Sequence, residues 1–203
     1  MTKMNNETIE QKLEKYHEFF SIEHNFSINI LPIELTKVTS FEQFLADMPT
    51  PFKMASDMKG IDQTALRPLQ ALSGVAGQLV EFLNHQSAKI DLLISYILSQ
   101  QDDEEHRYQG IKFGGGGLLF TANKAFKLAQ FLEMKIFLLN QNCAVYCYGE
   151  VIEIQQDEDS YLHKVIFHFI REDDREILVR NSLHAQSKQL QVLAQQRNQD
   201  GNN

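Results

Sequence analysis

The longest regular pattern of hydrophobic positions in the chain runs through residues 68–101. Apolar side chains recur there every seven residues in two interleaved series, so that the seam alternates spacings of three and four. A seam that lasts more than four heptads is typical of a coiled coil. The pattern predicts one long helix, and its predicted oligomerisation residues are Leu69, Leu72, Leu79, Leu83, Ile90, Leu93 and Ile97.

This predicted helix is long for a chain of 203 residues. It would extend about 50 Å, whereas a compact chain of this size has a radius of gyration of about 17 Å. The helix therefore either projects and packs against copies of itself, as a dimer or tetramer, or folds back on the core of its own domain. The length favours self-association. Gln86 and Gln100 in the seam can fix register and oligomer number, and Gly74 and Gly77 predict a kink or a late start.

Helical and strand periodicities divide the rest of the chain. A helical stripe precedes residue 21, residues 26–32 alternate as a strand that Pro32 ends or places at an edge, and Ser40 is positioned to cap a short helix. An acidic loop at 100–110 is followed by strands at 117–122, 134–139, 143–154 and 161–170. The last segment is a helix that starts near Asp173 and Asp174, with the predicted seam Val179, Leu183, Gln186, Leu190 and Leu193.

This order predicts an α+β fold. Closely spaced strands with hairpin-like links indicate a small antiparallel, Greek-key-like β-barrel, interrupted by a long helical insertion and closed by a C-terminal helix. The predicted divisions are an N-terminal helix in 1–24, the first barrel strand in 25–34, the helical oligomerisation arm in 35–105, the rest of the barrel with the C-terminal helix in 106–198, and a disordered tail in 199–203.

Composition and charge narrow the classes of function. A hydrophobic content of 43% describes a folded globular protein, and the net charge of −8 argues against binding of a nucleic-acid polymer, which needs clustered cations. The N-terminal segment has no apolar core for a signal peptide, and no window of about 18 apolar residues spans a membrane. We therefore expect a cytoplasmic protein. Cys143 and Cys147 lie four residues apart on a predicted strand, about 13 Å, which is too far for a disulfide, so buried free thiols are expected.

Four consecutive glycines, Gly114 to Gly117, interrupt the strand pattern directly before an apolar triplet. A P-loop requires a following Gly-Lys-Ser/Thr, and a dinucleotide fingerprint requires glycine where this chain has Leu119. Both nucleotide signatures are therefore excluded. The simplest structural interpretation is a β-bulge or a turn with positive φ angles.

With the strands and the helix that follow it, the segment from Gln109 to Phe120 resembles the PilZ domain, a bacterial family that commonly binds cyclic di-GMP. The chain is identified as an atypical, degenerate member with a helical insertion, and the resemblance implies a barrel of about six strands. In the family, an Asp/Asn-x-Ser-x-x-Gly turn contacts a base and an Arg-x-x-x-Arg pair holds the phosphates. The resemblance maps Lys112 to the Asp/Asn position, Gly114 to the Ser position and Gly117 to the final glycine.

The arginine pair of the family has no counterpart before the first strand, where Lys12 and Lys15 are the nearest cations. Arginine grips phosphate with a planar fork and stacks on guanine, and lysine does neither. The candidate nucleotide residues are therefore Arg107 and Lys112 as a replacement pair of cations, with Gly114 and Gly117 from the degenerate motif. Cyclic di-GMP is the only cofactor that the resemblance suggests.

No catalytic or metal-binding residues are predicted. His163 and His168 lie five residues apart on a strand and so face opposite ways, and no serine has a nucleophile-elbow sequence. The sequence predicts a non-enzymatic PilZ-family signalling or adaptor protein in a bacterial pathway related to cyclic di-GMP, controlling motility, pili or biofilm. It would act through a protein partner, with weak or no binding at the family's usual nucleotide site. The alternative is a genuine cyclic di-GMP receptor with a different pocket.

Overall fold

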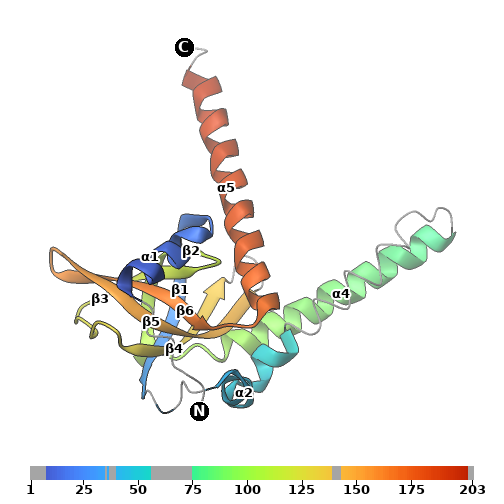
Figure 1. Cartoon of the computed structure of the whole chain (residues 1–203). Coiled ribbons are helices and arrows are strands. Elements are labelled where there is room, and N and C mark those ends of the chain that lie inside the picture. Colours follow the sequence, from blue (N-terminus) through green and yellow to red (C-terminus); the bar gives the residue numbers. More distant parts are fainter. Residues whose placement is uncertain (1–7, 35, 37–39, 56–74, 139–142, 201–203) are drawn as a thin grey trace.

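The computed structural model describes residues 8–34, 36, 40–55, 75–138 and 143–200. Six strands form the body of the protein, and helices lie before, between and after them (Figure 1). The elements are, in chain order, α1 (Ile9–Glu18), β1 (Ser21–Ile33), α2 (Phe41–Asp47), α4 (Val75–Ser99), η3 (Glu104–His106), β2 (Arg107–Gly114), β3 (Gly117–Ala122), β4 (Phe131–Leu138), β5 (Cys143–Asp157), β6 (Ser160–Phe169) and α5 (Glu172–Asp200).

The strands form a closed antiparallel barrel in the order β1-β2-β3-β6-β5-β4. β4 pairs back with β1, with Ile30 opposite Met134, so the sheet has no free edge. Closure removes the exposed row of backbone groups that an open edge presents. The predicted fold class, a small antiparallel barrel with a long helix and a C-terminal helix, is confirmed.

The barrel interior is filled by apolar side chains that alternate along each strand. Cys143, Val145 and Cys147 from β5 belong to this cluster with Ile28 and Ile30 from β1. Both cysteines are buried free thiols, as the sequence predicts, and burial raises the pKa of the Cys147 thiol. They therefore act as small hydrophobic residues.

The outer face of β4 and β5 is also buried, beneath the helical insertion. Tyr146 and Tyr148 from β5 pack against Phe44 of α2, with ring centroids 5.7 and 5.0 Å apart. The same cluster contains Phe52 and, from the far end of the insertion, Leu98. Both ends of the insertion are thus fixed to the barrel, which explains why β5 reads as an almost unbroken apolar run rather than an alternating one.

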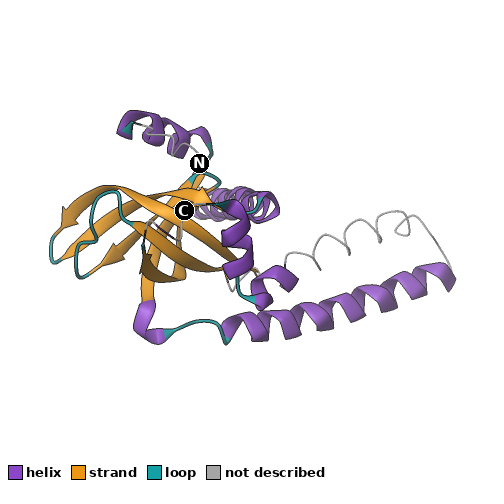
Figure 2. Cartoon of the chain, turned by 60° about the horizontal axis from the view of Figure 1, so that its bottom comes forward, coloured by secondary structure: helices purple, strands orange, loops and turns teal. Residues whose placement is uncertain are grey.

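From this anchored end α4 extends away from the barrel (Figures 1 and 2). Among the described residues of α4, only Ile94 and Leu98 join a hydrophobic cluster. Four of the predicted oligomerisation residues are between 40% and 64% exposed, namely Leu79, Ile90, Leu93 and Ile97, and Leu83 is half-buried. α4 is helical through Gly77, whereas Leu69, Leu72 and Gly74 lie outside the described residues. None of the described helices is long and apolar enough to cross a membrane.

The C-terminal helix packs through a different face from the predicted seam. Its buried residues are Asp174, Leu178, Ser182 and Ala185, which lie against the barrel near β1 and β2. The predicted seam residues Leu183, Leu190 and Leu193 are at least half exposed. The face that packs on the barrel is therefore offset by one residue from the predicted seam, whose first member, Val179, still approaches Gly115. α5 also continues to Asp200, into the predicted tail.

The largest departures from the predicted strand boundaries are at the starts of β1 and β2. β1 begins at Ser21, because its first residues pair with the end of β2, where Ser21 lies opposite Gly114. β2 begins at Arg107, inside the predicted acidic loop, because it has partners on both sides in β1 and β3. Pairing of β1 with β2, between residues 78 to 93 positions apart, decides both boundaries.

Candidate functional site

The four glycines form the connection between β2 and β3. β2 ends at Gly114, β3 begins at Gly117, and Phe167 of β6 donates a backbone hydrogen bond to the carbonyl oxygen of Gly116 at 3.0 Å. None of the four has a φ angle in the left-handed region. The predicted turn with positive φ angles is therefore absent, and another physical reason must explain why glycine is used.

That reason is the close approach of other backbone segments. A Cβ atom added at Gly114 would lie 2.3 Å from the carbonyl oxygen of Phe20, and one at Gly116 would lie 2.8 Å from that of Tyr16. At Gly117 it would lie 2.1 Å from the carbonyl oxygen of Val165. The glycine run thus lets α1, β6 and the start of β1 pack directly on the β2–β3 connection.

α5 covers the same connection from another direction. A Cβ atom at Gly115 would meet the side chains of Phe19 and Val179 at 2.6 and 2.7 Å. Arg175 of α5 donates a short hydrogen bond to the carbonyl oxygen of Gly115, and its guanidinium lies 5.4 Å from the centre of the Phe19 ring. The described cation nearest the glycine run is therefore already engaged by the protein itself.

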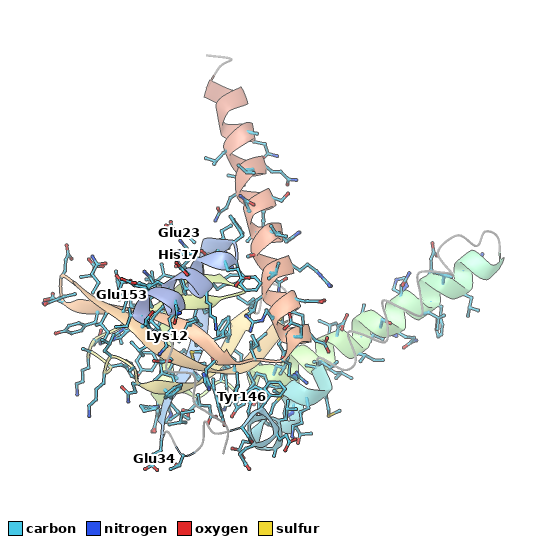
Figure 3. The ribbon with its side chains drawn as sticks, in the orientation of Figure 1. Lys12, His17, Glu23, Glu34, Tyr146 and Glu153 are labelled. Atoms are coloured by element: carbon cyan, nitrogen blue, oxygen red, sulfur yellow. The ribbon has the colours of Figure 1, made fainter. Side chains whose placement is uncertain are left out.

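α1 is held over the barrel by polar contacts as well as by packing. A capping box begins the helix, in which the backbone N–H of Gln11 donates to the Thr8 hydroxyl at 3.3 Å. Lys12 of α1, which is labelled in Figure 3, forms an ion pair of 2.6 Å with Glu150 of β5. Tyr16 is buried beneath the helix, and this burial, with the nearby Glu153 carboxylate, raises the Tyr16 pKa to about 12. Lys12, one of the two cations nearest the usual arginine positions, thus has a carboxylate partner.

The predicted replacement pair of cations does not converge. Arg107 lies at the far end of β2, where its Nε is bonded to both carboxylate oxygens of Asp102 at 3.1 and 3.0 Å. This contact raises the pKa of Arg107. Lys112 lies five residues along the strand, about 16 Å away, and is in register with Glu23 of β1. Of the predicted site residues, only Gly114 and Gly117 are brought together, and they are covered.

A second feature of the barrel is a buried histidine that supports the loop between β3 and β4. His163 is fully buried, its ring is stacked on Phe120 at 4.8 Å, and its Nε2 accepts a hydrogen bond from the backbone N–H of Phe126 at 3.0 Å. Burial lowers the pKa of His163. The sequence places His163 and His168 on opposite strand faces, and His168 is indeed exposed. What the sequence could not reveal is the bond to Phe126.

This histidine predicts a pH dependence of stability. Because its pKa is lower in the folded protein than in the unfolded chain, the unfolded chain binds the proton first as the pH falls below about 6.5. We expect His163 to lower the free energy of unfolding by up to about 1.4 kcal/mol per pH unit below that point. Substituting His163→Phe should remove this part of the slope, although loss of the acceptor costs about 1–2 kcal/mol at pH 8.

Urea unfolding from pH 8 to pH 5 measures this effect. The control is His184→Phe, which changes an exposed histidine of α5 and should keep the slope of the unmodified protein. Parallel curves for the His163→Phe variant and the unmodified protein would contradict the assignment.

Within the described ranges, no group of three or more metal-binding side chains could hold an ion. The contacts of its four glycines make the glycine run a packed junction of α1, α5 and the barrel strands, so that the positions of these elements depend on one another.

Comparison with known proteins agrees with the barrel fold. The family model of the PilZ domain matches residues 84–183, from the middle of α4 to the middle of α5. Together with the closed six-stranded barrel, this match shows that the chain contains a PilZ domain. The helical insertion before residue 84 and α1 lie outside the matched region. No curated protein matches the sequence.

Two solved structures resemble the protein. A protein from Xanthomonas campestris, described as a tetrameric PilZ domain self-assembled via an unusual helical bundle, shares 12% sequence identity with a TM-score of 0.57. That alignment covers 88% of this chain and 96% of the other. The Bacillus subtilis inhibitor of motility shares 16% identity with a TM-score of 0.38, over 40% of this chain and 42% of the other. At these identities the first likeness concerns the fold alone.

Proposed function

We propose that this PilZ-family protein is a signalling adaptor in a bacterial pathway related to cyclic di-GMP, such as one that controls motility, pili or biofilm. It works through protein contacts and binds nucleotide weakly or not at all at the family's usual site. The observation that carries this proposal is the filling of the glycine run by the protein's own α1 and α5.

Weak nucleotide binding follows from what a ligand would have to displace. A dinucleotide carries two phosphates and needs forked cations in the open. Arg175 is bonded to Gly115 and also lies 3.5 Å from Glu172. Lys12 is paired with Glu150. A ligand at this place would therefore have to break contacts of α1 or α5 before it made its own.

The protein contacts of the adaptor include self-association through α4. The four exposed apolar residues of the seam, Leu79, Ile90, Leu93 and Ile97, each gain about 1.5–3 kcal/mol when a partner helix removes them from water. The Xanthomonas protein, a tetramer assembled through a helical bundle, supports the same use of a projecting helix. We expect a dimer or tetramer, built from α4 helices.

Light scattering coupled to size exclusion tests this assembly. At tens of micromolar we expect a mass that is twice or four times the 23.4 kDa of one chain. A strict monomer at that concentration would contradict the proposal.

A further inference from the structure

A cavity of about 660 Å³ lies at the end of the barrel opposite the glycine run. Its walls are residues 107–109 at the start of β2, residues 121–122 at the end of β3, and the following loop with Gln130. Gln109 is paired with Thr121 in the sheet, whereas the glycine run joins the other ends of the same two strands. The cavity therefore shares no residue with the packed junction of α1 and α5.

The cavity is positively charged although the protein carries a net charge of −8. Arg107, Lys124 and Lys127 line it, and no carboxylate does. Asp102 and Glu104 bind Arg107, at 3.0 and 3.7 Å from its Nη2. When Asp102 and Glu104 are both counted against the three cations, an excess of one positive charge remains. Within the described ranges, no ion pair involves Lys124 or Lys127, so both can attract an anion.

The loop that carries the two lysines is tied down at several points. The backbone N–H of Phe126 donates to buried His163, and that of Lys127 donates to Oε1 of Gln130 at 2.8 Å. Backbone hydrogen bonds also join Ala129 and Gln130 to Val151 of β5, at 2.8 and 3.0 Å. Arg107 is likewise held by Asp102. Because the backbone of this loop is already ordered, the loop loses less conformational entropy when a ligand binds.

The cavity also offers an apolar wall. Tyr108 and Phe126 are both half-buried, and their ring centroids are 5.7 Å apart. Both rings also contact Phe120 of the barrel core. Aromatic surfaces of this kind accept the face of a planar ring whatever its exact identity. The volume falls in the range of about 300–1,000 Å³ that small-molecule sites occupy. A small ligand with both a negative group and a ring fits these properties better than a protein segment does.

We propose that this cavity binds a small phosphorylated compound with a planar ring, of mononucleotide size. Lys124 and Lys127 hold the phosphate as point charges, with Arg107 beside them. Tyr108 and Phe126 contact the ring, and the side-chain amide of Asn123, which also lines the cavity, hydrogen-bonds to the edge of the ring. This site is independent of assembly through α4 and of the covered glycine run.

Calorimetric titration of the full chain with adenosine monophosphate and guanosine monophosphate tests the site. Inorganic phosphate and adenosine are titrated in parallel, because each lacks one half of the proposed ligand. We expect a mononucleotide to bind at least tenfold more tightly than either half. Equal binding of inorganic phosphate would overturn the role of the ring, and equal binding of adenosine would overturn the role of the phosphate. No binding by any mononucleotide at millimolar concentration would overturn the proposal as a whole.

The double variant Lys124→Glu/Lys127→Glu locates the binding. We expect it to weaken mononucleotide binding at least tenfold, without changing the mass seen by light scattering. The matched control is Lys89→Glu/Lys188→Glu, which makes the same change in charge at exposed lysines of α4 and α5 and should bind as the unmodified protein does. Equal losses in the two double variants would show a general charge effect and overturn the site. Light scattering shows separately whether the protein still assembles, as the adaptor proposal predicts. A failure of the cavity proposal can therefore be told apart from a failure of the adaptor proposal.

Discussion

Substituting Ile90→Glu and Leu93→Glu together is expected to convert the assembled protein to monomers of 23.4 kDa. Both side chains lie on the exposed seam of α4, where they are 40% and 64% exposed in the single chain. Burying each apolar side chain contributes about 1.5–3 kcal/mol, whereas glutamate must be desolvated there. In a symmetric assembly every copy loses both contacts, so we expect association to weaken by at least about a hundredfold. Light scattering over a range of concentrations measures this change.

The control for this prediction is Leu92→Glu. Leu92 is 65% exposed, almost the same as Leu93, but it lies about 100° further round the helix and outside the heptad seam. Its substitution should leave the mass of the assembly unchanged. If Leu92→Glu dissociates the protein and the double seam variant does not, assembly uses another face of α4. If neither variant has an effect, assembly does not use the seam.

Substituting Gly117→Ala is expected to have the largest effect on stability among the glycines of the run. The added Cβ would lie 2.1 Å from a backbone carbonyl oxygen in β6, which cannot move without breaking the pairing of β3 with β6. Overpacking against rigid groups costs about 3 kcal/mol or more. We expect the midpoint of urea unfolding to fall accordingly, or the variant to fail to fold.

Gly115→Ala provides a graded comparison for this prediction. There the added Cβ would meet the side chains of Phe19 and Val179, which can shift. We expect a loss of about 1 kcal/mol, at the lower end of the overpacking range. A stability of Gly117→Ala equal to that of Gly115→Ala would contradict the close packing of β6 on the glycine run.

Local patterns in the sequence were sufficient for much of the fold. The heptad positions from Leu79 to Ile97 indicated a helix with an apolar seam, and the Val, Ile and aromatic content of β5 and β6 indicated barrel strands. The spacing of Cys143 and Cys147 on one strand was enough to exclude a disulfide. Each of these features depends on neighbours within a few residues, which is why periodicity reveals them.

The role of the glycine run was beyond such patterns. Glycines can serve a turn, a ligand or a close backbone contact, and the contacts of Gly116 and Gly117 come from α1 and β6, far away in sequence. The resemblance to a nucleotide-binding motif therefore drew attention to the right residues without revealing what they touch. The same limit explains why the cavity at the other end of the barrel was not foreseen. Arg107 and Lys127 line it together because the start of β2 pairs beside the end of β3, which leads into the loop that carries Lys127.

The central claim is that the protein's own helices occupy the place where the family usually binds its nucleotide. Calorimetric titration of the 203-residue chain with cyclic di-GMP tests it most directly. We expect no saturable heat of binding up to high micromolar ligand. Micromolar binding that weakens when Lys112 is changed to alanine would contradict it.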